Sequence, residues 1–88
     1  MKMLMLGAGN MVSCDRIVCI VSPDTSPVKR LVQDAKDEGR VIDDSGGKKT
    51  KSVILTDSDH VILSRIIPQK LRAALAGDGE VTEEDDDE

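Results

Sequence analysis

The sequence predicts a small α+β domain: a mixed β-sheet of about five short strands with two helices, in the order ββαβββα. Short apolar runs rich in Val and Ile recur along the chain, and one segment repeats apolar residues at helical spacing. The chain has 88 residues and no Phe, Tyr or Trp. Its core must therefore consist of aliphatic side chains, and its length allows only one small domain.

Two apolar runs predict the first strands. Residues 2–6, KMLML, form one strand, and the glycines of segment 7–10 end it as a turn. Residues 16–22, RIVCIVS, are almost continuously apolar and rich in β-branched side chains. This pattern is typical of a strand that is buried on both faces or covered by a neighbouring subunit.

A helix is predicted over residues 26–39, SPVKRLVQDAKDEG. Ser26 can cap its start, Pro27 suits the first helical position, and Gly39 supplies a C-terminal stop. The predicted helix has one apolar face, formed by the residues at positions i, i+3, i+4 and i+7: Val28, Leu31, Val32 and Ala35.

The second half of the chain contains three further strands and a short helix. Residues 40–43 and 50–57 flank a Gly-rich turn and are predicted to pair as a hairpin, with residues 60–66 as another strand. A helix over 68–76 starts at a proline and ends before Gly77. Both helices are expected on one side of the sheet.

Charge divides the chain into a domain, residues 1–77, and an acidic tail, residues 78–88. The tail holds eight of the seventeen acidic residues and none of the twelve basic ones, so the domain is mildly basic. Such a dense acidic run is expected to be disordered. Two interpretations stay open: a solubilising tail, or a tethered polyanion that competes with nucleic acid for the basic surface.

Several features point to a cytoplasmic protein that associates with itself. Cys14 and Cys19 are five positions apart in one strand region, an odd arrangement for a disulfide, and two cysteines are too few for a zinc site, so both are expected to be reduced. The sequence shows no signal peptide and no stretch long enough to span a bilayer, so no membrane partner is expected. Because so short a chain buries only about 60% of its unfolded surface, we expect a homo-oligomer.

Three short motifs could suggest an enzyme, but none of them supports one. GAGNMV at 7–12 lacks the third glycine of a dinucleotide fingerprint, and GGKKT at 46–50 has Lys49 where a P-loop needs a hydroxyl. DSDH at 57–60 offers two carboxylates and a histidine to a metal or to general-base catalysis, but turn hydrogen bonds are the favoured interpretation. We therefore predict no catalytic residue, metal, cofactor or small-molecule substrate. Catalysis remains a distant alternative that would need Asp57, Asp59 and His60.

Clustered basic residues predict an anionic partner. The segment GGKKTKSV, residues 46–53, places three lysines within four positions, although like charges repel one another. Two more cations fall in the first turn of the predicted helix, where the macrodipole disfavours them but free N–H groups can bind a phosphate. With one arginine at a strand start, the predicted DNA-binding residues are Arg16, Lys29, Arg30, Lys48, Lys49 and Lys51.

The absence of aromatic residues narrows the kind of nucleic acid. Modules that bind single strands stack bases on aromatic side chains, at about 1–3 kcal/mol per base. Duplex binding requires only cations and shape. Double-stranded DNA is therefore the predicted partner, while an RNA-binding ring and a scaffold that assembles without nucleic acid remain alternatives.

Two long segments carry a family resemblance. GAGNMVSCDRIVCIVSPDTSPVKRLVQDAKDEGRVID is followed by GGKKTKSVILTDSDHVILSRIIP. Together, across residues 2–72, they resemble the RemA-like bacterial regulators, the extracellular matrix regulatory family. The resemblance implies a ring-forming protein around which duplex DNA curves and which activates transcription of matrix genes. By matching positions it implies DNA contacts from Arg16, Arg30, Lys48 and Lys49. The family hairpin is usually arginine-rich, and lysine lacks the planar fork of arginine.

Overall fold

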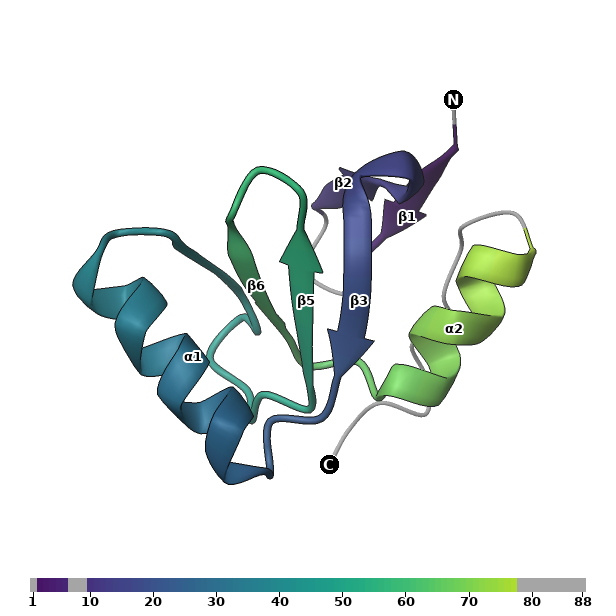
Figure 1. Ribbon diagram of the computed structural model, residues 1–88. Helices are drawn as coiled ribbons and strands as arrows, with labels where there is room; N and C mark the ends of the chain where they lie inside the picture. The colour runs from purple at the N-terminus through teal and green to yellow at the C-terminus, as the bar shows by residue number, and fades with distance from the viewer. Residues whose placement is uncertain (1, 7–9, 78–88) are drawn as a thin grey trace.

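A computed structural model describes residues 2–6 and 10–77. It contains two small sheets and two helices (Figure 1), which confirms the predicted α+β class. The elements are β1 (Met3–Met5), β2 (Met11–Ser13), the 3₁₀ turn η1 (Cys14–Arg16), β3 (Ile17–Val21), α1 (Ser26–Asp37), β4 (Val41–Asp44), β5 (Ser52–Thr56), β6 (Val61–Ser64) and α2 (Pro68–Ala76). The glycines of the predicted 7–10 turn and the acidic tail lie outside the described residues.

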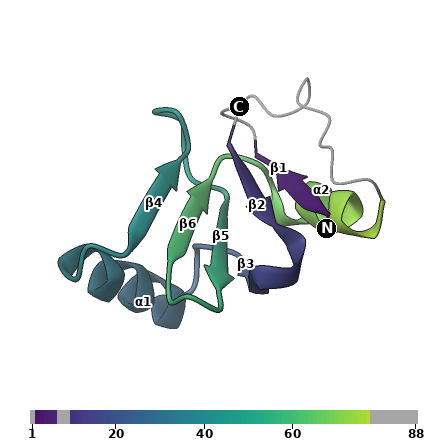
Figure 2. The same ribbon diagram turned by 90° about the horizontal axis from the view of Figure 1, so that it is seen from above.

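The larger sheet has the strand order β3-β5-β6-β4. β5 pairs antiparallel with both β3 and β6, whereas β4 pairs parallel with β6, with Val41 opposite Val61. The predicted hairpin between residues 40–43 and 50–57 is therefore wrong. The hairpin is instead β5–β6, closed by the turn at 57–60, which is a shorter connection than segment 45–51. Figure 2 shows β6 lying between β4 and β5.

Both faces of the larger sheet are covered, and by different helices. Successive side chains of a strand point to opposite faces. On one face, Val53 and Val61 pack in a cluster with Ala35 of α1. On the other face, Ile54 and Ile62 pack in a second cluster, which also contains side chains of α2 and β1. α1 and α2 thus lie on opposite sides of the sheet (Figure 1), and the expectation of helices on one side is wrong. The central strands β5 and β6 carry apolar side chains on both faces, so both faces must be covered for these side chains to be buried.

The N-terminal third of the chain departs most from the prediction. β3 pairs only with β5, so it is an edge strand, and Val18 is 65% exposed. Of the two alternatives for this strand, burial on both faces within the chain is wrong, and cover by a neighbouring subunit stays a prediction. Arg16 belongs to η1 and not to a strand. β2 was not predicted, because three residues carry too little periodic signal; it pairs with β1 in a separate sheet, with Met5 opposite Met11.

The helix ends follow their proline and glycine signals. α1 begins at Ser26, but the N-cap is Thr25, without a side-chain cap bond, so the predicted capping role of Ser26 is wrong. α1 ends at Asp37, and Gly39, with φ of +72°, turns the chain so that the Arg40 N–H donates to the Ala35 carbonyl at 2.9 Å. α2 matches its predicted bounds. Cys14 and Cys19 form no disulfide. In the part of the chain described, neither helix has the length and apolar character needed to cross a membrane.

Candidate nucleic-acid interface

The two ends of the larger sheet carry the candidate residues. We call the end where β3 finishes and β5 begins the lysine end; it includes the loops 22–25, 45–51 and 65–67. We call the opposite end, formed by η1 and the turn 57–60, the arginine end. The length of β5 separates the two ends by about 15 Å. In Figure 1 the lysine end is at the bottom and the arginine end at the top.

Hydrogen bonds anchor both ends of the lysine-bearing loop 45–51. Asp43 Oδ1 accepts from the Ser45 N–H at 2.9 Å and from the Ser45 hydroxyl at 2.6 Å. The hydroxyl bond, then the N–H bond, and more weakly the nearby Lys36 charge keep the pKa of Asp43 below its ordinary value, against a small opposing effect of burial. At the far end of the loop the Lys51 N–H donates to the Ser64 carbonyl at 2.8 Å.

The middle of this loop is a tight glycine turn. Gly46 and Gly47 have φ of +64° and +84°, and the Lys48 N–H donates to the Ser45 carbonyl at 3.1 Å. Two consecutive left-handed residues favour glycine at both positions. The glycines that precede the lysines in the sequence therefore shape the backbone that presents them.

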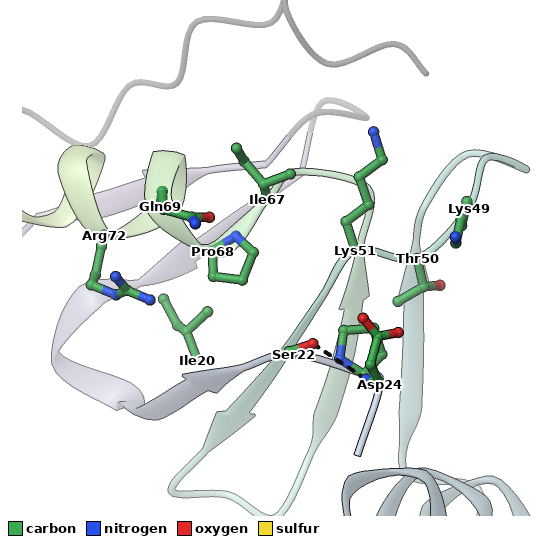
Figure 3. A pocket seen from close by; sticks show the side chains of 11 residues that line it. Ile20, Ser22, Asp24, Lys49, Thr50, Lys51, Ile67, Pro68, Gln69 and Arg72 are labelled. Atoms are coloured by element: carbon green, nitrogen blue, oxygen red, sulfur yellow. Dashed lines mark hydrogen bonds between the residues drawn. The ribbon is translucent and has the colours of Figure 1, made fainter.

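Cations from three elements meet at the lysine end. Lys49 and Lys51 line a groove of about 500 Å³ together with Arg72 of α2 (Figure 3). Lys29 and Lys36 of α1 line an adjacent depression of about 250 Å³, and both hollows share Pro23 and Thr50. None of these five cations forms an ion pair with a described carboxylate. Their charge is therefore available to an external anion.

The predicted residues do not all share this end. Lys29, Lys49 and Lys51 come together there, with Lys48 exposed on the glycine turn between β4 and β5. Arg30, the fifth residue of α1, is exposed but lines neither hollow.

Arg16 lies at the arginine end, separated from the lysines by the length of β3. Its Nη1 is 3.3 Å from Asp57 Oδ2, and both side chains are largely exposed. Such surface pairs contribute at most about 1 kcal/mol. Asp57 therefore neutralises Arg16 in part but can release it at small cost.

The turn at 57–60 is held by its own side chains. The Ser58 hydroxyl lies 3.0 Å from Thr56 Oγ1 and 2.8 Å from His60 Nδ1, and Asp59 adopts φ of 67°. The favoured interpretation of DSDH as a hydrogen-bonded turn is confirmed. Across residues 2–6 and 10–77, no three His, Cys, Asp or Glu side chains gather in a way that could hold a metal.

Comparison of the sequence with known proteins shows the family of this chain. Residues 3–75 match the model of the RemA-like family, described as extracellular matrix regulatory protein A-like. The chain belongs to the RemA-like family. A relative from Geobacillus thermodenitrificans, named "Putative regulatory protein", is 49% identical over 84 residues, which is 96% of this chain and 97% of the relative. A protein of the same name from Clostridium perfringens is 48% identical over 86 residues, or 98% of this chain and 97% of the relative.

Two cations of this RemA-like chain were missed from the sequence. Lys36 lies seven residues after Lys29 on α1, a spacing that places both on one helix face, so this signal was present. Arg72 gave no such signal, because only the packing of α2 beside the ends of β3 and β5 brings it to the lysines.

Proposed function

We propose that this RemA-like protein is a cytoplasmic transcriptional regulator that binds double-stranded DNA through its lysine end. The observation that carries the proposal is the convergence, on one end of the sheet, of cations from α1, loop 45–51 and α2 that form no ion pair with any carboxylate of residues 2–6 and 10–77. Duplex DNA carries one negative charge per about 1.7 Å of its axis, and neutralising phosphates releases condensed counterions. The chain has no aromatic residue on which unpaired bases could stack.

Assembly into a ring is part of this proposal. β3 and β4 are the two outer strands of the larger sheet, and each carries an exposed apolar residue: Val18 is 65% exposed and Ile42 is 46% exposed. Open strand edges with exposed apolar side chains favour association. Because the two edges differ, a contact of one edge with the other runs head to tail and can close a ring. The family resemblance supports the ring and a role in activating matrix genes.

A ring also accommodates Arg16. Arg16 lies about 15 Å from the lysine end, yet one duplex that spans the subunit from the lysine end to the arginine end would present phosphates at both ends. Copies in fixed geometry would repeat these contacts and add avidity without new chemistry. On this arrangement Arg16, Lys29, Arg30, Lys48, Lys49 and Lys51 all contact the sugar–phosphate backbone.

Binding of a fluorescent duplex over about 50 to 200 mM salt tests the DNA proposal. The logarithm of the affinity should fall linearly with the logarithm of salt concentration, by about 0.9 per phosphate contact. Unlabelled duplex should compete better than single-stranded RNA of matched length. Stronger competition by RNA would favour an RNA-binding ring, and an assembly that binds neither polymer would favour a scaffold. Native mass measured with and without duplex tests the ring.

A further inference from the structure

The groove between loop 45–51 and α2 is lined by apolar as well as basic side chains, and a phosphate group would contact only the basic ones. We call it the Arg72 groove. Ile20, Ile67 and Pro68 line it as apolar side chains, with Arg72 on one side of them and Lys51 on the other (Figure 3). Lys49 and Asp24 also belong to the lining, so three cations face one carboxylate. The lining therefore matches a segment that carries several carboxylates around an apolar side chain.

The chain contains one such segment directly after α2. Residues 78–88, DGEVTEEDDDE, include eight acidic residues, and Val81 is their only aliphatic side chain. Two acidic residues precede Val81 and six follow it, with no basic residue among them. The charge of this segment is thus complementary to the groove on both sides of its single apolar residue.

The segment is long enough to reach the groove from its own chain. α2 spans nine residues from Pro68 to Ala76, or about 14 Å. Four residues of extended chain from Gly77 to Val81 also span about 14 Å. Val81 can therefore return to the level of Pro68 and Arg72, and the acidic residues beyond it can extend toward the lysines.

We propose that residues 78–88 dock in the Arg72 groove of the same chain. Val81 contacts Ile20 and Ile67, the preceding carboxylates face Arg72, and the following carboxylates face Lys49 and Lys51. Short flexible connections give a tethered segment an effective concentration in the millimolar range, so weak contacts are sufficient. Docking does not depend on DNA binding, but it would occupy cations of the lysine end and so oppose a polyanionic partner.

The test uses the full chain without DNA, with Ile and Val methyl groups isotopically labelled for NMR. Docking is expected to give nuclear Overhauser effects from the Val81 methyls to the Ile20 and Ile67 methyls. The Ile42 methyl, on the outer strand β4, is the internal control and should give none. Val81→Ser should shift the Ile20 and Ile67 signals and leave Ile42 unchanged. Raising the salt concentration should weaken the Val81 effects, because carboxylates contribute to docking.

Two matched variants separate the groove from general charge. Arg72→Gln is expected to weaken or abolish the Val81 effects, whereas Lys70→Gln, the same charge change on the same helix but outside the groove lining, should preserve them. The proposal would be overturned if the Val81 methyls gave no nuclear Overhauser effect to Ile20 or Ile67. It would also be overturned if both variants weakened these effects equally. A sample that mixes Ile-labelled with Val-labelled chains distinguishes the source: effects between chains would assign the groove to the tail of a second copy and overturn docking within one chain.

Discussion

The lysine end and the arginine end of the larger sheet both carry predicted DNA contacts, but their cations have different surroundings. At the lysine end, cations from α1, loop 45–51 and α2 meet without forming ion pairs among the described residues. At the arginine end, Arg16 pairs with Asp57 at 3.3 Å. A cation without an ion pair can offer its full charge to a bound polyanion, whereas Arg16 would first have to leave its carboxylate. Whether each basic residue already pairs with a carboxylate is therefore a better guide to the binding of an anionic partner than the number of basic residues.

Removing charge at the lysine end should have the largest effect. Lys49→Gln with Lys51→Gln is expected to lower duplex affinity by tenfold or more and to reduce the salt slope by about 0.9 for each lost contact. A matched control makes the same two-charge change elsewhere, with Arg40→Gln and Lys70→Gln. Anisotropy titrations over a salt series measure both quantities. Equal losses in the two double variants would show that only net charge matters and would break the distinction between the ends.

Releasing Arg16 should have a smaller effect, in the opposite direction. Asp57→Asn removes the partner of Arg16, and an exposed pair of this kind is worth up to about 1 kcal/mol, so affinity should rise by about two- to fivefold. Arg16→Gln should weaken binding, but less than the double lysine change.

The same titrations with both substitutions separate the pair from general charge. If Arg16 contacts DNA, Asp57→Asn should increase affinity less in the Arg16→Gln background than in the native chain. Native affinity in Arg16→Gln would exclude Arg16 from the interface and leave the lysine end as the only one of the two ends that binds.

The acidic tail should act on the lysine end alone. Deleting residues 78–88, or replacing their carboxylates by amides, is expected to tighten DNA binding modestly because a tethered competitor is removed. The gain should shrink in the Lys49→Gln, Lys51→Gln background and persist with Arg16→Gln. Identical affinities for the full-length and truncated chains would leave the tail as a solubilising segment.

The smallest expected effect concerns the stability of the lysine-bearing loop. Ser45→Ala removes a hydroxyl that donates to Asp43, and should lower the free energy of unfolding at pH 7 by about 1 kcal/mol. Because these bonds hold the pKa of Asp43 below its unfolded value, their stabilisation is present above the unfolded pKa and is lost as pH falls through the folded pKa. Urea unfolding should therefore show a smaller difference below about pH 4. A difference that stays constant with pH would show that ionised Asp43 does not anchor the loop.

Local signals accounted for the helices and most strands. Pro68 and Gly77 bound α2 as predicted, and Gly39 adopts the left-handed conformation expected after a helix. These signals act within a few residues, through a fixed proline φ, a missing Cβ or helical spacing. β2 escaped prediction because a three-residue strand depends on its partner β1 more than on its own sequence.

The candidate site was predicted only in part, for a related reason. The lysines of loop 45–51 and the first turn of α1 could be identified from charge and position, and Lys49, Lys51 and Lys29 do meet. That Arg72 joins them, and that Arg16 lies at the other end of β3, follow from which strands and helices pack together.

By itself the sequence determined most element types, the family, the aliphatic core and the set of available charges, since these depend on residue identity and on neighbours along the chain. Only the tertiary structure decided that β4 pairs with β6, that α1 and α2 cover opposite faces, and which cations share one end. Strand pairing and helix placement are chosen by burial between segments far apart in the sequence, and a local pattern contains no information about its distant partner.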